Sequence, residues 1–251
     1  MGTAIPGADF AGRKHLIEES TVFYAPSLAA AREMRSLTRN AVDPSHTVLA
    51  FGAPAKSSVS LPVPLDAGRE LREVGQIYGE KSAAVFTGEQ ADKDHWKTEA
   101  PRYRILHVAT HGVLDNNNPL SSFLDLNRRA ADREDNVIAA REILSMSLKA
   151  DMAVLSACEM ALGEYRHGEG VIGMSWAFLI AGTPTTVVSQ WKADSASTSQ
   201  LMVAFHKNLK SHTDFSGKAE ALRSAALALM EKPQYKHPFY WAGFVVIGDG
   251  F

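Results

Sequence analysis

The chain has 251 residues, of which 45% are hydrophobic and 22% charged, with a formal net charge of −2 and a single cysteine. This balance is ordinary for a globular protein and predicts no attraction to nucleic acid or to an anionic membrane surface. A single cysteine excludes an internal disulfide, no apolar stretch approaches the roughly 20 residues of a membrane helix, and the first residues lack a signal-peptide pattern. We therefore expect a cytoplasmic protein.

Strands and helices alternate in the first half, after an irregular N-terminal arm at residues 1–20. The expected elements are a strand at 21–25, a helix at 27–38, a strand at 47–52, a loop at 53–64, a helix at 65–78, a strand at 83–86 and a polar helix at 90–100. In the helix at 65–78, Leu71, Val74 and Tyr78 share one apolar face, while Glu70 and its charged neighbours lie mostly on other faces.

Two apolar strands in the middle of the chain each end on a reactive residue. The strand at 104–109 leads to His111 and the strand at 151–158 ends on Cys158. Between them we expect a loop at 111–119, a hairpin arm at 122–126, a charged connection at 127–136 and a short helix at 139–146.

The last third continues the alternation. We expect a loop at 163–170, a buried helix at 171–181, a buried strand at 184–190, helices at 195–209 and 218–231, and a strand at 244–247. Trp176 and Trp241 are expected in the core. The pattern predicts a three-layer α/β/α sandwich with a mostly parallel central sheet and a small hairpin, in a single domain at 21–251.

Cys158 and His111 are the candidate catalytic residues. Both follow apolar strands, and the carboxyl ends of parallel strands are where α/β proteins build their sites. A thiol with a pKa of about 8.5 needs a base such as imidazole to become a thiolate at neutral pH. The backbone N–H groups of Gly112 and Cys158 are candidates for an oxyanion hole.

Two other site types find little support. His107 and His111 have His-x-x-x-His spacing, but the segment is strand-like and lacks the glutamate of the zinc motif, so His107 is better interpreted as a histidine satisfied inside the fold. The segment 163–170 lacks the lysine of a phosphate loop. We expect no metal and no cofactor.

Six spaced motifs resemble the CHAT family of caspase-like (clan CD) cysteine peptidases, which is related to separase. They are His-Val-Ala-Thr-His-Gly at 107–112, Val-Leu-Ser-Ala-Cys-Glu at 154–159, Gly-Glu-Gly at 168–170, Ala-Phe-Leu-Ile-Ala-Gly at 177–182, Val-Ser-Gln-Trp at 188–191 and His-Pro-Phe-Tyr-Trp-Ala-Gly-Phe at 237–244. The resemblance runs from about residue 24 to residue 248.

The resemblance implies a caspase-like fold, a dyad of His111 and Cys158, and endopeptidase activity on a protein substrate. It also implies a tetratricopeptide-repeat or other sensor module, in the same chain or a partner chain, and a regulated role in bacterial defence or signalling.

The substrate pocket is the least defined part of the site. In separase-like relatives an aspartate shortly after the Trp motif lines the pocket for a basic P1 side chain, which implies Asp194 here. An equal alternative is that Asp194 is the N-cap of the helix at 195–209. Trp191 is a candidate pocket wall, and Asp125 is a candidate for lining the pocket or orienting the dyad.

Two other functions remain open. The chain can be a caspase-fold interaction module that is inactive until a partner or activator completes the site, or an acyl transferase that uses the same dyad.

Overall fold

The computed structural model describes residues 14–25, 27–36, 46–52, 66–113, 115, 118–126, 137–156, 169–192, 194–212 and 216–251, without the side chains of 169–173. None of the helices in these segments is long and apolar enough to cross a membrane.

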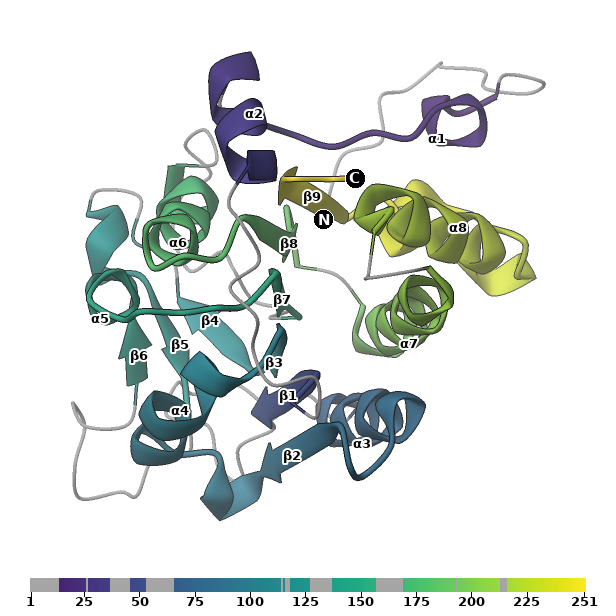
Figure 1. Ribbon diagram of the computed structural model, residues 1–251. Helices are drawn as coiled ribbons and strands as arrows, with labels where there is room; N and C mark the ends of the chain where they lie inside the picture. The colour runs from purple at the N-terminus through teal and green to yellow at the C-terminus, as the bar shows by residue number, and fades with distance from the viewer. Residues whose placement is uncertain are drawn as a thin grey trace.

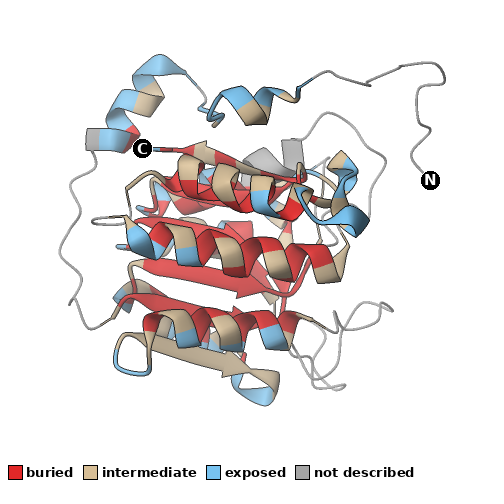
Figure 2. Cartoon of the chain, turned by 90° about the vertical axis from the view of Figure 1, so that its right-hand side faces the viewer, coloured by how far each residue is buried: buried red, intermediate tan, exposed pale blue. Residues whose placement is uncertain are grey.

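The centre of the fold is a six-stranded sheet in the order β2-β1-β3-β7-β8-β9, in which only β9 runs antiparallel to its neighbour. The strands are β1 (Val48–Gly52), β2 (Ala83–Thr87), β3 (Ile105–Ala109), β7 (Met152–Leu155), β8 (Thr185–Ser189) and β9 (Phe244–Gly248). Every residue of β1, β3, β7 and β8 is buried, as expected for parallel strands covered on both faces. The edge strand β2, at the bottom of Figure 2, is only half-buried.

Helices cover both faces of this sheet (Figure 1). One layer consists of α3 (Ala67–Tyr78), α7 (Ser195–Ser211) and α8 (Lys218–Met230), which lie side by side in Figure 2. The other layer contains α4 (Lys93–Glu99), α5 (Ala140–Leu144) and α6 (Glu169–Ile180). A separate hydrophobic cluster fills each space between helices and sheet. The three-layer sandwich predicted from the alternation is therefore confirmed.

A second, smaller sheet follows β3 directly. It is antiparallel, has the order β4-β5-β6, and consists of β4 (His111–Val113), β5 (Phe123–Asp125) and β6 (Val137–Ala139). The expected loop at 111–119 thus begins with a strand, and the predicted hairpin has a third member. Short 3₁₀ turns complete the chain at Gly88–Gln90, Ala100–Arg102, Pro119–Ser121, Pro233–Tyr235 and Pro238–Tyr240.

The N-terminal segment differs from the expectation. Residues 21–25 make a single bridge, Tyr24 to Ile247, because only Tyr24 reaches the open edge of β9. The expected irregular arm contains a short helix, α1 (Leu16–Glu19), whose carbonyls accept hydrogen bonds from Arg223 of α8. It is followed by α2 (Leu28–Ser36).

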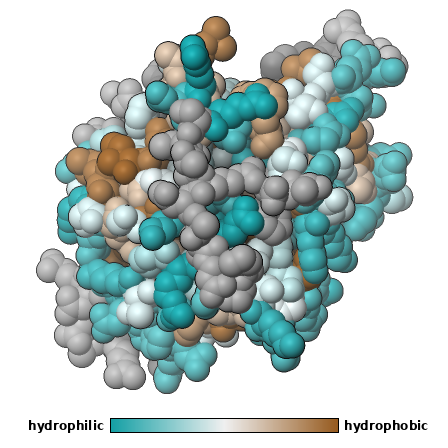
Figure 3. Space-filling view, viewed as in Figure 1, coloured by the Kyte–Doolittle hydropathy of each residue, from teal (hydrophilic) through white to brown (hydrophobic). Residues whose placement is uncertain are grey.

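Helix α6 is less buried than its apolar sequence suggests. Trp176 is 41% exposed and Ile180 63% exposed, so the prediction that Trp176 belongs to the core is wrong. The two residues are one helical turn apart and therefore share a face. Leu120, which is 47% exposed, lies in the turn Pro119–Ser121 that contacts α6. Figure 3 shows a hydrophobic area over this part of the molecule. Trp241, at 4% exposure, is in the core as predicted.

Candidate active site

The carboxyl ends of three central strands lie side by side. In the sheet register Val108 of β3 pairs with Leu155 of β7, and Leu155 pairs with Val188 of β8. Three residues beyond these partners in the sequence are His111, Cys158 and Trp191. The segments that lead to these three residues therefore leave the sheet at the same level of its carboxyl edge.

His111 lies at the junction between the two sheets. β3 ends at Ala109, Thr110 makes the turn, and His111 opens β4 with only 1% of its surface exposed. The hydroxyl of Thr110 donates a hydrogen bond to the backbone carbonyl of Asp125, which ties the junction to the end of β5. The position of His111 is thus set by backbone structure on both sides.

Cys158 itself lies outside the described residues, as do Glu159 and most of the segment 163–170. The described chain reaches Ser156, whose N–H donates to the Val108 carbonyl at 2.8 Å. The hydroxyl of Ser156 is buried and makes no hydrogen bond within the described residues. The role of the Cys158 thiol as nucleophile and the role of its backbone N–H as an oxyanion donor remain predictions.

Gly112 follows His111 in β4 and pairs with Leu124 of β5. It is buried, with its backbone in a regular strand. Its role as an oxyanion donor stays a prediction.

The pocket candidates fall in different surroundings. Asp194 is the N-cap of α7: its Oδ2 accepts a hydrogen bond from the Ser197 N–H at 2.8 Å, so the capping alternative is confirmed. The Trp191 indole donates to the Phe239 carbonyl at 3.1 Å and packs over Gly243. Asp125 is fully buried, directly across from His111 in the β4–β5 pair.

His107 is a core histidine, as predicted. It is completely buried, its Nε2 lies 2.8 Å from Glu70 Oε1, and its Nδ1 lies 2.9 Å from His206 Nε2. The other ring nitrogen of His206 lies 3.0 Å from the Tyr78 hydroxyl. One hydrogen-bonded row therefore joins α3, β3 and α7 inside the core.

The row was only partly visible in the sequence. Glu70 was expected on a face other than the apolar one, yet it is only 3% exposed, so that prediction is wrong. The signal was present, because Glu70, Val74 and Tyr78 are spaced at four-residue intervals and share a face. Nothing in the sequence around His206, which lies in the middle of a helix, indicated that it contacts His107.

Burial changes the acid–base behaviour of this row. Desolvation, together with the nearby His107, holds the pKa of His206 well below its usual range. Desolvation also raises the pKa of Tyr78 above its usual value. Both side chains are therefore neutral near pH 7.

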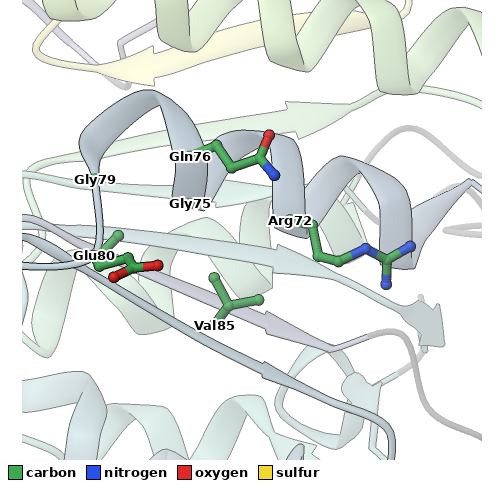
Figure 4. Close-up of a pocket in the computed structure, with 7 residues that line it drawn as sticks. Arg72, Gly75, Gln76, Gly79, Glu80 and Val85 are labelled. Carbon is green, nitrogen blue, oxygen red and sulfur yellow. The ribbon is translucent and has the colours of Figure 1, made fainter.

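A groove of about 370 Å³ lies between α3 and the edge strand β2 (Figure 4). It is lined by Arg72, Gly75, Gln76, Gly79, Glu80, Ala83 and Val85. The groove faces the start of β2 and the carboxyl end of α3, and hence lies away from the sheet edge that holds His111. Among the described residues, no group of three or more His, Cys, Asp or Glu side chains is arranged to hold a metal ion.

The fold is similar to that of known cysteine proteinases. The complex of Porphyromonas gingivalis RgpB pro- and mature domains aligns with a TM-score of 0.57 and 10% sequence identity, over 89% of this chain and 52% of that chain. The Arg-specific cysteine proteinase gingipain R (RgpB) gives a TM-score of 0.56 and 11% identity, over 89% and 51%. At such low identity the likeness concerns the fold alone.

The three-layer sandwich with its mostly parallel sheet therefore defines an α/β protein whose fold is similar to that of a cysteine proteinase. A family description narrows this class. The model of the CHAT domain matches residues 4–249, nearly the whole chain, and the chain belongs to the CHAT family.

Two curated relatives share part of the sequence. The human tetratricopeptide repeat protein 28 is 28% identical over 116 residues, and its mouse counterpart is 28% identical over 113. The matches cover 46% and 45% of this chain but only 4% of each relative. The matched segment is thus a small part of much longer proteins.

Proposed function

We propose that the chain is a cysteine endopeptidase in which Cys158 is the nucleophile and His111 the base. The observation that carries the proposal is that Val108 pairs with Leu155 in the sheet. His111 comes three residues after Val108, and Cys158 comes three residues after Leu155. Three residues of extended chain span about 10 Å at most, so both segments stay near one edge.

The reaction follows from these groups. His111 takes the proton of the Cys158 thiol, and the thiolate sulfur bonds to the carbonyl carbon of the substrate peptide bond. The N–H groups of Gly112 and Cys158 then donate hydrogen bonds to the resulting oxyanion. His111 then gives the proton to the leaving amine as the C–N bond breaks. Water, activated by His111, hydrolyses the thioester and restores the thiol.

The proposed pocket uses Asp194 and Trp191, which follow β8 at the same edge. Capping α7 occupies an oxygen of Asp194 but leaves its negative charge in place. We propose that this charge favours a basic P1 side chain.

We further propose that the peptidase is a regulated effector in the bacterial cytoplasm, controlled by a tetratricopeptide-repeat or other sensor module. The name of the curated relatives, in which the matched segment is a small part, supports this arrangement. The same observation favours a second candidate, an interaction module that is inactive until such a partner completes the site.

The test is a search for new protein N-termini in a bacterial lysate incubated with the purified chain. We expect cleavage products with wild type that are absent with Cys158→Ala and with His111→Ala. If either variant generates the same termini at the wild-type rate, the dyad is wrong. Products that appear only after a repeat-containing partner is added support the second candidate, and acylated amines without new N-termini indicate an acyl transferase.

A further inference from the structure

Asp125 and His111 are direct neighbours in the small sheet. The register of β4 and β5 pairs His111 with Asp125 and Gly112 with Leu124. Residues directly opposite each other in an antiparallel pair project to the same face, with Cβ atoms about 4.5–5.5 Å apart. The carboxylate and the imidazole therefore leave their strands side by side.

The other neighbour of Asp125 is apolar. β5 lies between β4 and β6, and on β6 Asp125 pairs with Val137. Of its two cross-strand partners, only His111 has a polar side chain. In the small sheet, His111 is therefore the cross-strand neighbour whose side chain can complement the charge of the Asp125 carboxylate.

Thr110 locks this pairing. Its hydroxyl, in a residue with no exposed surface, donates to the Asp125 carbonyl one residue before β4 starts. A slip of one residue would pair Asp125 with Gly112 and turn every side chain of the slipped strand to the opposite face. The bond opposes such a slip.

Burial makes the pairing significant. Asp125 has no exposed surface and His111 has 1%. A buried carboxylate costs several kcal/mol unless it is paired or hydrogen-bonded, so a protein rarely keeps one where an apolar residue would fit equally well. A fully buried carboxylate is also poorly placed to line a substrate pocket.

We propose that Asp125 is a positioning residue for His111, fixing the orientation of its imidazole and stabilising the imidazolium formed during catalysis. This inference rests on the proposed function. The proton moves from the Cys158 sulfur to His111 and then to the leaving amine, while Asp125 exchanges no proton.

The test compares Asp125→Asn with Val137→Ala, which disturbs packing on the other side of Asp125 and leaves all charges in place. We expect D125N to lower kcat about tenfold or more with little change in KM, because general acid–base catalysis is worth about 10²- to 10⁴-fold and depends on orientation. The limb of the pH–rate profile that reports His111 should move to lower pH, since a nearby carboxylate favours the imidazolium. V137A should keep the wild-type profile.

A second measurement does not depend on turnover. The titration of the His111 ring, followed by NMR, should have its midpoint at lower pH in D125N than in wild type. Asp125→Ser replaces D125N if that variant does not fold. An unshifted midpoint in a folded variant overturns the inference. If C158A and H111A are inactive while D125N matches wild type, only the role of Asp125 fails, whereas activity in C158A refutes the proposed function itself.

Discussion

Glu70 and His107 form a buried hydrogen-bonded pair, with Oε1 of the carboxylate 2.8 Å from Nε2 of the imidazole. Their side chains are 4% and 0% exposed, and they join α3 to the strand that leads to His111. A buried charge of this kind is costly when its partner is removed. The pair therefore holds the α3 layer against β3.

The first prediction follows from this pair. His107→Ala should lower the free energy of unfolding by about 3–5 kcal/mol, because it leaves the Glu70 carboxylate buried without this partner. Urea denaturation measures the change. Glu73→Gln, which breaks the surface pair with Arg69 on the same helix, should leave the unfolding midpoint nearly unchanged. Equal effects of the two variants would contradict the account.

His206 predicts how stability depends on pH. Its pKa in the folded protein is lowered, mainly by desolvation, whereas an unfolded histidine titrates near pH 6.5. Below about pH 6.5 the unfolded chain binds a proton that folded His206 does not, so stability falls with decreasing pH by up to about 1.4 kcal/mol per pH unit. The decline continues until the pH reaches the folded pKa.

Denaturation at several pH values checks this prediction. His206→Phe should show a flatter decline below pH 6.5 than wild type, whatever its overall stability. His212→Gln, near the end of the same helix, is the matched control and should decline like wild type. A His206→Phe protein with the wild-type slope would show that the row does not carry this linkage.

Gly52 tests the packing of the sheet edge. It ends β1 with a φ of 130°, and a Cβ there would collide with the Ala109 carbonyl, two residues before His111. Gly79 also has a positive φ, 85°, but its added Cβ would meet no atom within 4 Å. Gly52→Ala should therefore cost about 1–3 kcal/mol more than Gly79→Ala, the usual penalty for overpacking. Equal unfolding midpoints for the two variants would show that β1 does not constrain the edge.

The two roles of Asp194, as the N-cap of α7 and as the proposed pocket residue, can be measured separately. Asp194→Ala should lower the free energy of unfolding by about 1 kcal/mol through loss of the N-cap, and Asp194→Asn, which keeps the acceptor oxygen, should not. Both variants should lose the proposed preference for Arg or Lys at P1, measured with peptide substrates that differ only at P1. If D194N keeps that preference, Asp194 serves only as the cap.

Local patterns predicted most of the fold. Continuous apolar runs indicated the buried parallel strands, and the position of Asp194 directly before the helix at 195–209 indicated its cap. The errors concern contacts between distant segments. Glu70 was expected away from the apolar face of its helix because its partner His107 is 37 residues away. Trp176 was expected in the core because nothing in α6 shows which apolar face the rest of the chain covers. For the candidate site, the sequence predicted His111 and its position at the edge of the sheet. The pairing of His111 with Asp125 depends on the register of the β4–β5 hairpin, and the hairpin loop carries no sequence signal that indicates this register.

The most direct test of the account is the reactivity of Cys158 toward a peptidyl acyloxymethyl ketone, followed by intact mass. The chain has one cysteine, so a single adduct reports that residue alone. We expect wild type to react about 100-fold faster than His111→Ala and than the urea-unfolded chain, because a base within reach generates the thiolate. Equal rates in all three would contradict the proposal that His111 and Cys158 form a catalytic dyad.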